Sequence, residues 1–187
     1  VRVPLEQVTE GRASYTGLEI SWVLAAQVQC DPAEDDYIGA RAHTNNTGEL
    51  SALHYAIARA YIRPRGSGTD VIHTDSLYAK NMATGKWMPK TQRNKEMIED
   101  MRAHWRALQR KRPGEVCIQH VRSHVRVPGN EIADWLAERG ADRRQCSIRS
   151  AERYISSELR KWRQEGVASP PHPTPPIHTN TPVDAPT

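Results

Sequence analysis

Apolar residues recur along this chain at two spacings, one typical of helices and one typical of strands. The clearest helical pattern lies between 44 and 63, with members at i, i+3, i+4, i+7 and i+11: Leu50, Leu53, His54, Ile57 and Tyr61. Short runs rich in β-branched residues alternate with such patterns and predict strands. The predicted strands cover 3–8, 18–29, 35–42, 70–74 and 115–121, and the predicted helices cover 44–63, 76–82, 94–112, 130–140 and 150–164.

The order of these elements indicates an α/β fold. Three strands precede the first long helix and are separated by short turns, so we expect them to be antiparallel. The two later strands are joined by helices and are expected to run parallel, which gives a mixed five-stranded sheet flanked by helices. Binding sites in such sheets form at the carboxyl ends of parallel strands. Asp75, after the strand 70–74, and His124, beyond the strand 115–121, are therefore expected at one edge.

The chain divides into a folded part and a proline-rich end. We expect one domain over 1–145, an additional C-terminal helix over 146–166 and a disordered tail over 167–187, where seven of the 13 prolines lie. The tail is expected to be solvated, and docking of a partner domain on its proline-rich stretch is the alternative. The chain begins with Val1 instead of Met, which indicates a trimmed or fragmentary N-terminus.

Composition narrows the classes of function only slightly. Lys and Arg number 26 against 22 acids, which gives a net charge of +4 and weakly favours a polyanionic partner. No apolar run approaches the length of a membrane span and no signal peptide is recognisable, so we expect no membrane association. The three cysteines lack zinc-site spacing and are expected to be reduced thiols in a reducing intracellular compartment, the cytoplasm or nucleus, with an organelle as the alternative. We expect a monomer.

Candidate chemistry is concentrated in residues 120–140. His124 lies in the loop after the last predicted strand, and Asp134 lies in the first turn of the next helix, where the helix dipole favours a carboxylate. Asn130 is a good N-cap residue for that helix. A loop histidine and a helix acid at the end of a strand suit a hydrolytic site, although a solvated histidine and an ordinary helix-start acid give the same pattern.

Two further acids lie upstream, Glu49 in the first long helix and Asp75 after the strand 70–74. Hard divalent cations such as Mg²⁺ prefer carboxylate oxygens, and two such ions can activate a nucleophile and neutralise the leaving oxygen in phosphodiester hydrolysis. Each acid also has a structural explanation. Glu49 is then a first-turn helix acid, Asp75 a strand-end cap and Asp134 a helix-start acid.

Three ordered motifs resemble those of type 1 ribonuclease H, within the ribonuclease H-like superfamily. The motifs are TNNTGEL from Thr44, Thr74-Asp75-Ser76 with Tyr78 following, and SHVRVPGNEIADWLA over 123–137. The resemblance covers roughly 18–140 and implies a ribonuclease H-like fold. It also implies a metal-dependent endonuclease that cuts the RNA strand of RNA–DNA hybrids and leaves 5′-phosphate and 3′-hydroxyl ends.

The resemblance assigns roles by position. Glu49, Asp75 and Asp134 become ligands of a two-metal Mg²⁺ site that also accepts Mn²⁺, and His124 becomes a proton shuttle, which suits the ordinary pKa of histidine. The residues expected to contact the hybrid are Asn46, Lys86, Trp87, Asn94, Lys95 and Asn130. The segment around Trp87 is similar to the family's region that holds the DNA strand, and a solvated loop anchored by one tryptophan is the alternative. Only the RNA 2′-hydroxyl distinguishes the strands locally.

The sequence departs from the family pattern in its first strand. The family has an Asp there, but no Asp precedes Asp31, and Glu10 followed by Gly11 stands at the corresponding place. Either Glu10 replaces that Asp, or the true first strand lies upstream and is missing or altered. The function therefore has three interpretations: an active ribonuclease H, a hybrid-binding module with an impaired site, or the ribonuclease H domain of a retroelement polyprotein.

Overall fold

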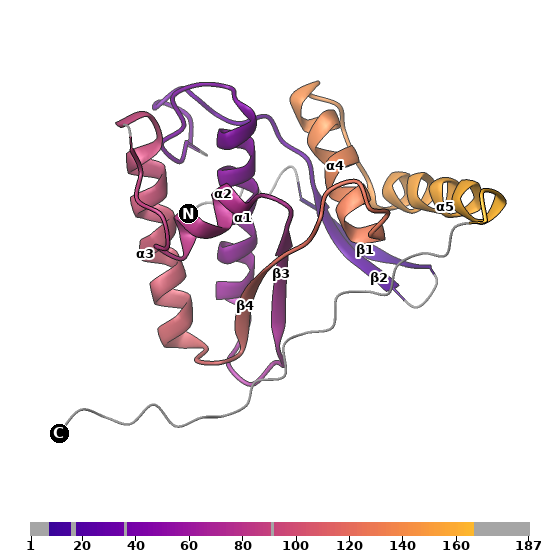
Figure 1. Cartoon of the computed structure of the whole chain (residues 1–187), viewed down its shortest axis with the longest axis horizontal. Coiled ribbons are helices and arrows are strands. Elements are labelled where there is room, and N and C mark those ends of the chain that lie inside the picture. Colours follow the sequence, from indigo (N-terminus) through magenta and orange to yellow (C-terminus); the bar gives the residue numbers. More distant parts are fainter. Residues whose placement is uncertain (1–7, 16–17, 36, 91, 167–187) are drawn as a thin grey trace.

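The computed structural model describes residues 8–15, 18–35, 37–90 and 92–166. Its helices and strands form two groups that lie side by side (Figure 1). The first group contains α1 (Asn45–Ile62), β3 (Asp70–Thr74), α2 (Leu77–Ala83), the short 3₁₀ helix η2 (Gln92–Asn94), α3 (Lys95–Lys111) and β4 (Val116–His120). The second group contains β1 (Val8–Tyr15), β2 (Leu18–Leu24), α4 (Pro128–Ala141) and α5 (Ile148–Gln164). Within these ranges no helix is both long enough and apolar enough to cross a membrane.

The prediction of an α/β architecture with parallel later strands is confirmed. β3 and β4 pair in parallel, with Asp70 opposite Val116 at one end and Thr74 opposite His120 at the other. A further backbone bond from Val121 N–H to the Thr74 carbonyl, 3.0 Å long, extends the pair by one residue. The carboxyl ends of both strands therefore lie together, as the sequence predicted.

The predicted five-stranded sheet is not formed by the described residues. β1 and β2 make an antiparallel pair, and β3 and β4 make a second, separate sheet. The described part of the segment 35–42 is irregular, so the strand predicted there is wrong. Gly39 has φ +90°, and a Cβ on it would lie 2.9 Å from the backbone nitrogen of Met97. The segment is thus pressed against the start of α3, and only glycine fits that approach.

The long helices follow the predicted periodicity closely. α1 begins with a capping box in which Thr44 and Thr47 exchange side-chain and backbone hydrogen bonds. Its predicted apolar face is buried except for Tyr61, which lies in the exposed last turn. On α3 the apolar residues Met97, Ile98, Met101 and Leu108 are also buried, with Trp105 partly covered at the edge of the core. The helix boundaries at 63 and 112 are correct to one residue.

The helix that carries Asp134 differs from its prediction. It begins at Pro128, two residues before the predicted N-cap, and Val127 stands at the N-cap without a side-chain hydrogen bond. Proline is favoured in the first turn because it has no N–H to leave unsatisfied. Ile132 is buried, but Ala133 and Ala137 are exposed, so the buried apolar face of α4 is narrow.

Two hydrophobic clusters correspond to the two groups of elements. The larger lies between α1, α2, α3 and the β3–β4 pair. The smaller joins β2, α4 and α5, with Ile132, Ile155 and Trp162 among its members. At Gly140 a Cβ would lie 2.7 Å from the Ala26 carbonyl oxygen, so α4 approaches the end of β2 as closely as a backbone can. The helix predicted for 150–164 is therefore part of the second core.

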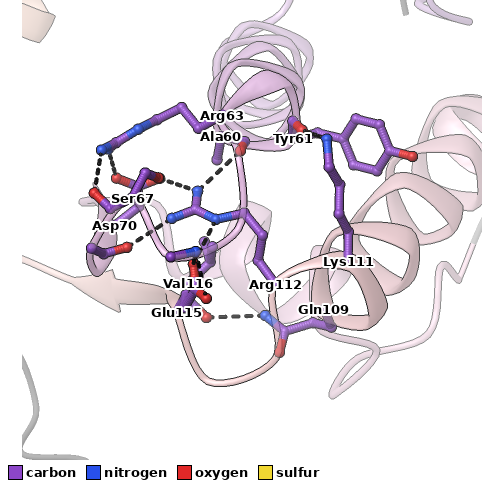
Figure 2. Close-up of polar contacts among 12 residues, drawn as sticks. Ala60, Tyr61, Arg63, Ser67, Asp70, Gln109, Lys111, Arg112, Glu115 and Val116 are labelled. Atoms are coloured by element: carbon purple, nitrogen blue, oxygen red, sulfur yellow. Dashed lines mark hydrogen bonds and ion pairs between the residues drawn. The ribbon is translucent and has the colours of Figure 1, made fainter.

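A buried arginine ties the first group together (Figure 2). The Arg112 side chain, just after α3, has no exposed surface. Its guanidinium donates to the Ala60 carbonyl at 3.1 Å, to the Gly68 carbonyl at 2.8 Å and to the Glu115 carboxylate at 3.1 Å. It also forms an ion pair with Asp70 at the start of β3. One side chain thus fixes the end of α1, both strand starts and the loop between α1 and β3.

We expect Arg112→Met to lower the free energy of unfolding by about 3 to 5 kcal/mol, because it leaves buried carboxylate and carbonyl oxygens without their partner. Urea denaturation followed by circular dichroism measures the change. Arg110→Met is the matched control, since Arg110 lies in the exposed last turn of the same helix. It should change stability by no more than about 0.5 kcal/mol. Equal effects of the two substitutions would refute the structural role of Arg112.

Candidate active site

Three acids from three elements are brought together where the two groups meet. Glu49 lies in the second turn of α1, Asp75 follows β3, and Asp134 lies in the second turn of α4. Neither Glu49 nor Asp134 is thus the first-turn acid that the sequence suggested, and the first-turn acid of α4 is Glu131. Each of the three is partly buried. The chain positions that were predicted to form one site therefore face a common region.

Among the acids of this region, Glu49 has the pKa that is raised furthest. Burial, followed by the charges of Asp75 and Asp134, raises the pKa of Glu49 to about 7 from its ordinary 4.5. Two like charges shift a carboxyl pKa only when they are near it. The contribution of these two charges to the shift fits neighbouring side chains, although Asp75 and Asp134 are 26 and 85 positions from Glu49 in the sequence.

Asp134 is the second acid whose pKa is raised, first by burial and then by the charge of Asp75. One of its oxygens, Oδ2, is buried without a hydrogen-bond partner among the described residues. The Nδ1 atom of His124 lies 3.7 Å from that oxygen, beyond hydrogen-bond distance. A buried carboxylate oxygen without a donor is energetically unfavourable, so a ligand that supplies positive charge would stabilise it.

His124 lies opposite Asp134 on the solvent side of the site. Its side chain is 83 % exposed, and its backbone has φ +53°, a left-handed conformation that is uncommon outside glycine. Arg126, two residues later, is also left-handed and donates its backbone N–H to Glu131 at 3.1 Å. The loop is thus sharply bent and anchored to α4 while the imidazole is left accessible.

Asp75 is held by residues from two other elements. The Asn130 amide donates to Asp75 Oδ2 at 3.2 Å, which links α4 directly to the end of β3. The His120 ring bonds the Asp75 carbonyl through Nε2 at 3.1 Å. Asn130 was predicted to contact substrate, and His120 was not among the predicted site residues. The signal for His120 was its position two and four residues after buried Ile118 and Val116, which puts a polar ring on the inward side of β4.

The predicted substrate residues fall into two groups. Lys86 and Trp87 are exposed in the segment that joins α2 to α3, and Lys95 is exposed at the first position of α3. Asn46 is exposed in the first turn of α1. Trp87 is 48 % exposed, yet its backbone is anchored, since its N–H bonds the Asn81 carbonyl at 3.1 Å and its carbonyl accepts from Arg102. An exposed aromatic ring on a fixed backbone, beside lysines, suits contact with a nucleic-acid strand.

Asn94 does not fit the role predicted for it. Its side chain is buried at the start of α3, where it makes no cap hydrogen bond. It is therefore not placed to meet a ligand from solvent. Glu10 lies opposite Trp22 in the β1–β2 pair, next to a bulge, but its side chain is outside what the structure describes. Its role as a first metal ligand stays a prediction.

Three observations show that the acids fit a divalent cation. Burial and the charges of neighbouring acids raise the pKa of Glu49 and Asp134, and in the described part of the chain no lysine or arginine forms an ion pair with Glu49, Asp75 or Asp134. The buried Oδ2 of Asp134 also lacks a partner among those residues. Uncompensated carboxylates of this kind are the ligands that Mg²⁺ and Mn²⁺ prefer.

Comparisons with known proteins identify similar proteins over most of the described chain. The family model described as RNase H matches residues 16–142. A ribonuclease H of Dichelobacter nodosus is 38% identical over 113 residues, which are 56% of this chain and 71% of that protein. A ribonuclease H of Saccharopolyspora erythraea is 37% identical over 114 residues, 57% of this chain and 70% of that protein. No solved structure gives a significant match.

We expect Glu49→Gln to stabilise the metal-free protein at pH 8 by roughly 1 kcal/mol, a value that allows for partial exposure to solvent. The pKa of Glu49 is about 7 in the folded protein and 4.5 ordinarily, so ionisation of Glu49 destabilises the folded state. This loss of stability is absent below pH 4.5, grows as the pH rises and is complete above pH 7. Glutamine cannot ionise, so the two proteins should have equal stability at pH 4. Urea unfolding in EDTA between pH 4 and 8 measures the difference, with exposed Glu96→Gln as control.

Proposed function

The chain belongs to the ribonuclease H family, and from this membership we propose that it hydrolyses the RNA strand of RNA–DNA hybrids. The proposal includes dependence on Mg²⁺ or Mn²⁺ and products with 5′-phosphate and 3′-hydroxyl ends. The observation that carries it is the electrostatic coupling of Glu49 with Asp75 and Asp134. All three acids lie within the residues that the family model matches.

Glu49, Asp75 and Asp134 are the residues that would hold the metal ions. When bound, such ions supply an activated water nucleophile and neutralise charge that develops on the phosphate. The protein's part is to keep the carboxylates in place. Asn130 does so for Asp75 by its 3.2 Å hydrogen bond, and the rigid helices α1 and α4 do so for the other two acids.

His124 is the residue that would handle protons. It is exposed, so it can exchange protons with solvent, and its Nδ1 lies 3.7 Å from Asp134. An imidazole beside a carboxylate can accept a proton while the carboxylate stabilises the resulting cation. The bent loop at 122–127 gives the ring access to a phosphate placed over the acids without burying it.

The exposed segment between α2 and α3 is where the DNA strand would lie. Lys86 and Lys95 provide positive charge for backbone phosphates, and Trp87 provides a surface for a sugar or base. The RNA strand would then lie over the acids. Asn46, at the exposed start of α1, is near enough in sequence to Glu49 to contact the RNA 2′-hydroxyl, which sets RNA apart from DNA.

A second candidate is a hybrid-binding protein with weak cleavage. It is favoured by the glutamate at position 10, where the family pattern has aspartate, and the match to the family model begins only at residue 16. The longer side chain displaces its oxygens by about one methylene, and errors of 1 Å in a site can lower rates by about 10²-fold. This protein would still bind hybrids through the segment around Trp87.

Labelled RNA–DNA hybrid should be cut in Mg²⁺, while single-stranded RNA and double-stranded RNA should remain essentially intact. Addition of EDTA should stop the reaction, because without metal ions the carboxylates can neither activate water nor neutralise charge on the phosphate. Asp75→Asn should lose at least about 10²-fold in rate. Equal cutting of all substrates, or cutting in EDTA, would contradict the nuclease proposal. Hybrid binding in Ca²⁺ without cleavage in Mg²⁺ would favour the second candidate.

His124→Ala should lower kcat by about 10²-fold, the ordinary contribution of a positioned acid or base. Hybrid affinity in Ca²⁺ should change little, since the exposed ring makes no hydrogen bond to another described residue. Single-turnover cleavage and filter binding measure the two quantities separately. Exposed His43→Ala is the matched control and should leave both unchanged. Lost affinity with unchanged turnover would show that His124 positions substrate instead.

A further inference from the structure

Two histidines and an aspartate meet between α1 and α3, away from the three acids. His54 Nε2 and His104 Nδ1 are 2.9 Å apart, and both lie close to Asp100 Oδ2, at 3.7 Å and 3.6 Å. Among the residues that the structure describes, this is the group of three metal-ligating side chains whose ligand atoms all lie within 4.8 Å of one another. We propose that His54, Asp100 and His104 form a site for a transition-metal ion such as Zn²⁺.

The backbone holds the three ligands in place before any metal binds. Asp100 and His104 are four residues apart on α3, so they project from the same face of that helix. His54 reaches them from α1, which packs directly against α3. Two ligands on one rigid helix and a third on its neighbour leave little conformational freedom to lose on binding.

The chemistry of the set favours a transition metal over Mg²⁺. Imidazole nitrogens with one carboxylate are typical ligands of Zn²⁺, whereas Mg²⁺ and Ca²⁺ prefer oxygen ligands alone. Zn–N bonds of about 2.0–2.1 Å place two tetrahedral nitrogens about 3.3 Å apart. The two rings would have to separate by a few tenths of an ångström, replacing their mutual hydrogen bond by two metal bonds.

Burial gives the site one closed side and one open side. The His54 side chain is 0 % exposed, while His104 is 34 % and Asp100 is 51 % exposed. The other ring nitrogen of His54, Nδ1, is buried without a hydrogen-bond partner in the described part of the chain. The polar contacts of the His54 ring are therefore made with His104 and Asp100. An ion can reach the three side chains from the solvent side, past Asp100 and His104.

The protonation state of His54 suits a ligand. Burial and the neighbouring His104 lower the pKa of His54 to about 4. The ring is therefore neutral at physiological pH and does not have to release a proton before it binds a metal. A hydrogen bond between two helices is the competing explanation for the pair. It accounts for the histidines but not for the adjacent Asp100 carboxylate.

The site is distinct from the three acids although α1 contributes to both. Glu49 and His54 are five positions apart, which places them about 140° apart around the helix axis. A metal that joins α1 to α3 would stabilise the element that presents Glu49. The proposal does not depend on the proposed nuclease function, because its ligands are not the three acids and its test measures metal binding instead of cleavage.

The test uses the full chain, stripped of metal with EDTA and dialysed, in an Asp75→Asn background that weakens the acid site. Co²⁺ should give the visible absorption bands of a tetrahedral nitrogen–oxygen site at one equivalent, and Zn²⁺ should displace it and raise Tm. His104→Gln and Asp100→Asn should abolish the bands and weaken Zn²⁺ binding at least about tenfold. Glutamine at 104 can still hydrogen-bond His54, so the metal-free variant should fold normally.

Two controls match the variants in kind. Glu99→Gln removes the exposed acid next to Asp100, and His43→Ala removes an exposed histidine far from α3 in sequence. Both should keep the Co²⁺ bands and the Zn²⁺ affinity. Bands that persist in His104→Gln would overturn the proposal, and so would a chain that binds neither ion. A metal-free His104→Gln with a lowered Tm and no response of the parent chain to Zn²⁺ would establish a hydrogen-bonded helix contact instead.

Discussion

The buried guanidinium of Arg112 is the interaction on which the first group of elements depends. A charge with no exposed surface is stable only when every donor is matched, and here the partners come from the end of α1, the following loop, β3 and the start of β4. Those segments must therefore all be in place at once. Asp70, at the other end of β3 from Asp75, is fixed in this way, so the network also sets where the strand delivers Asp75 relative to Glu49.

The acid site lies where the two hydrophobic clusters meet, and this location explains its electrostatics. Glu49 and Asp75 are carried by α1 and the end of β3, which contribute to the larger cluster, while Asp134 is carried by α4, which contributes to the smaller one. Packing the clusters together forces like charges into a partly buried space, which raises the pKa of Glu49 and Asp134. The cost in stability is offset by apolar burial elsewhere, and the hydrogen bond from Asn130 to Asp75 joins the two halves at the site itself.

α1 connects two regions of contrasting chemistry. Near its start it presents Glu49 toward the carboxylates of Asp75 and Asp134, which suit hard cations, and about one turn later it presents His54 to an imidazole and a carboxylate. Helical geometry separates the two sets by direction, since positions five apart point to different sides. The capping box at Thr44 and Thr47 fixes where the helix begins and hence which residues face each region.

The periodicity of apolar residues was sufficient to predict the helices and strands in which one face is buried and the other is exposed to solvent. The sequence alone located α1, α3, β3 and β4 within about one residue and identified the acids on separate elements, because 3.6-residue and two-residue periodicities are set by backbone geometry. It also indicated the family through its three motifs. Tertiary contacts decided what periodicity does not encode. The segment 35–42 packs against Met97 instead of pairing with β2, Asn94 is buried, and α4 starts at Pro128. Arg112, and the meeting of His54 with Asp100 and His104, depend on residues about 40 to 50 positions apart becoming neighbours, which only packing determines.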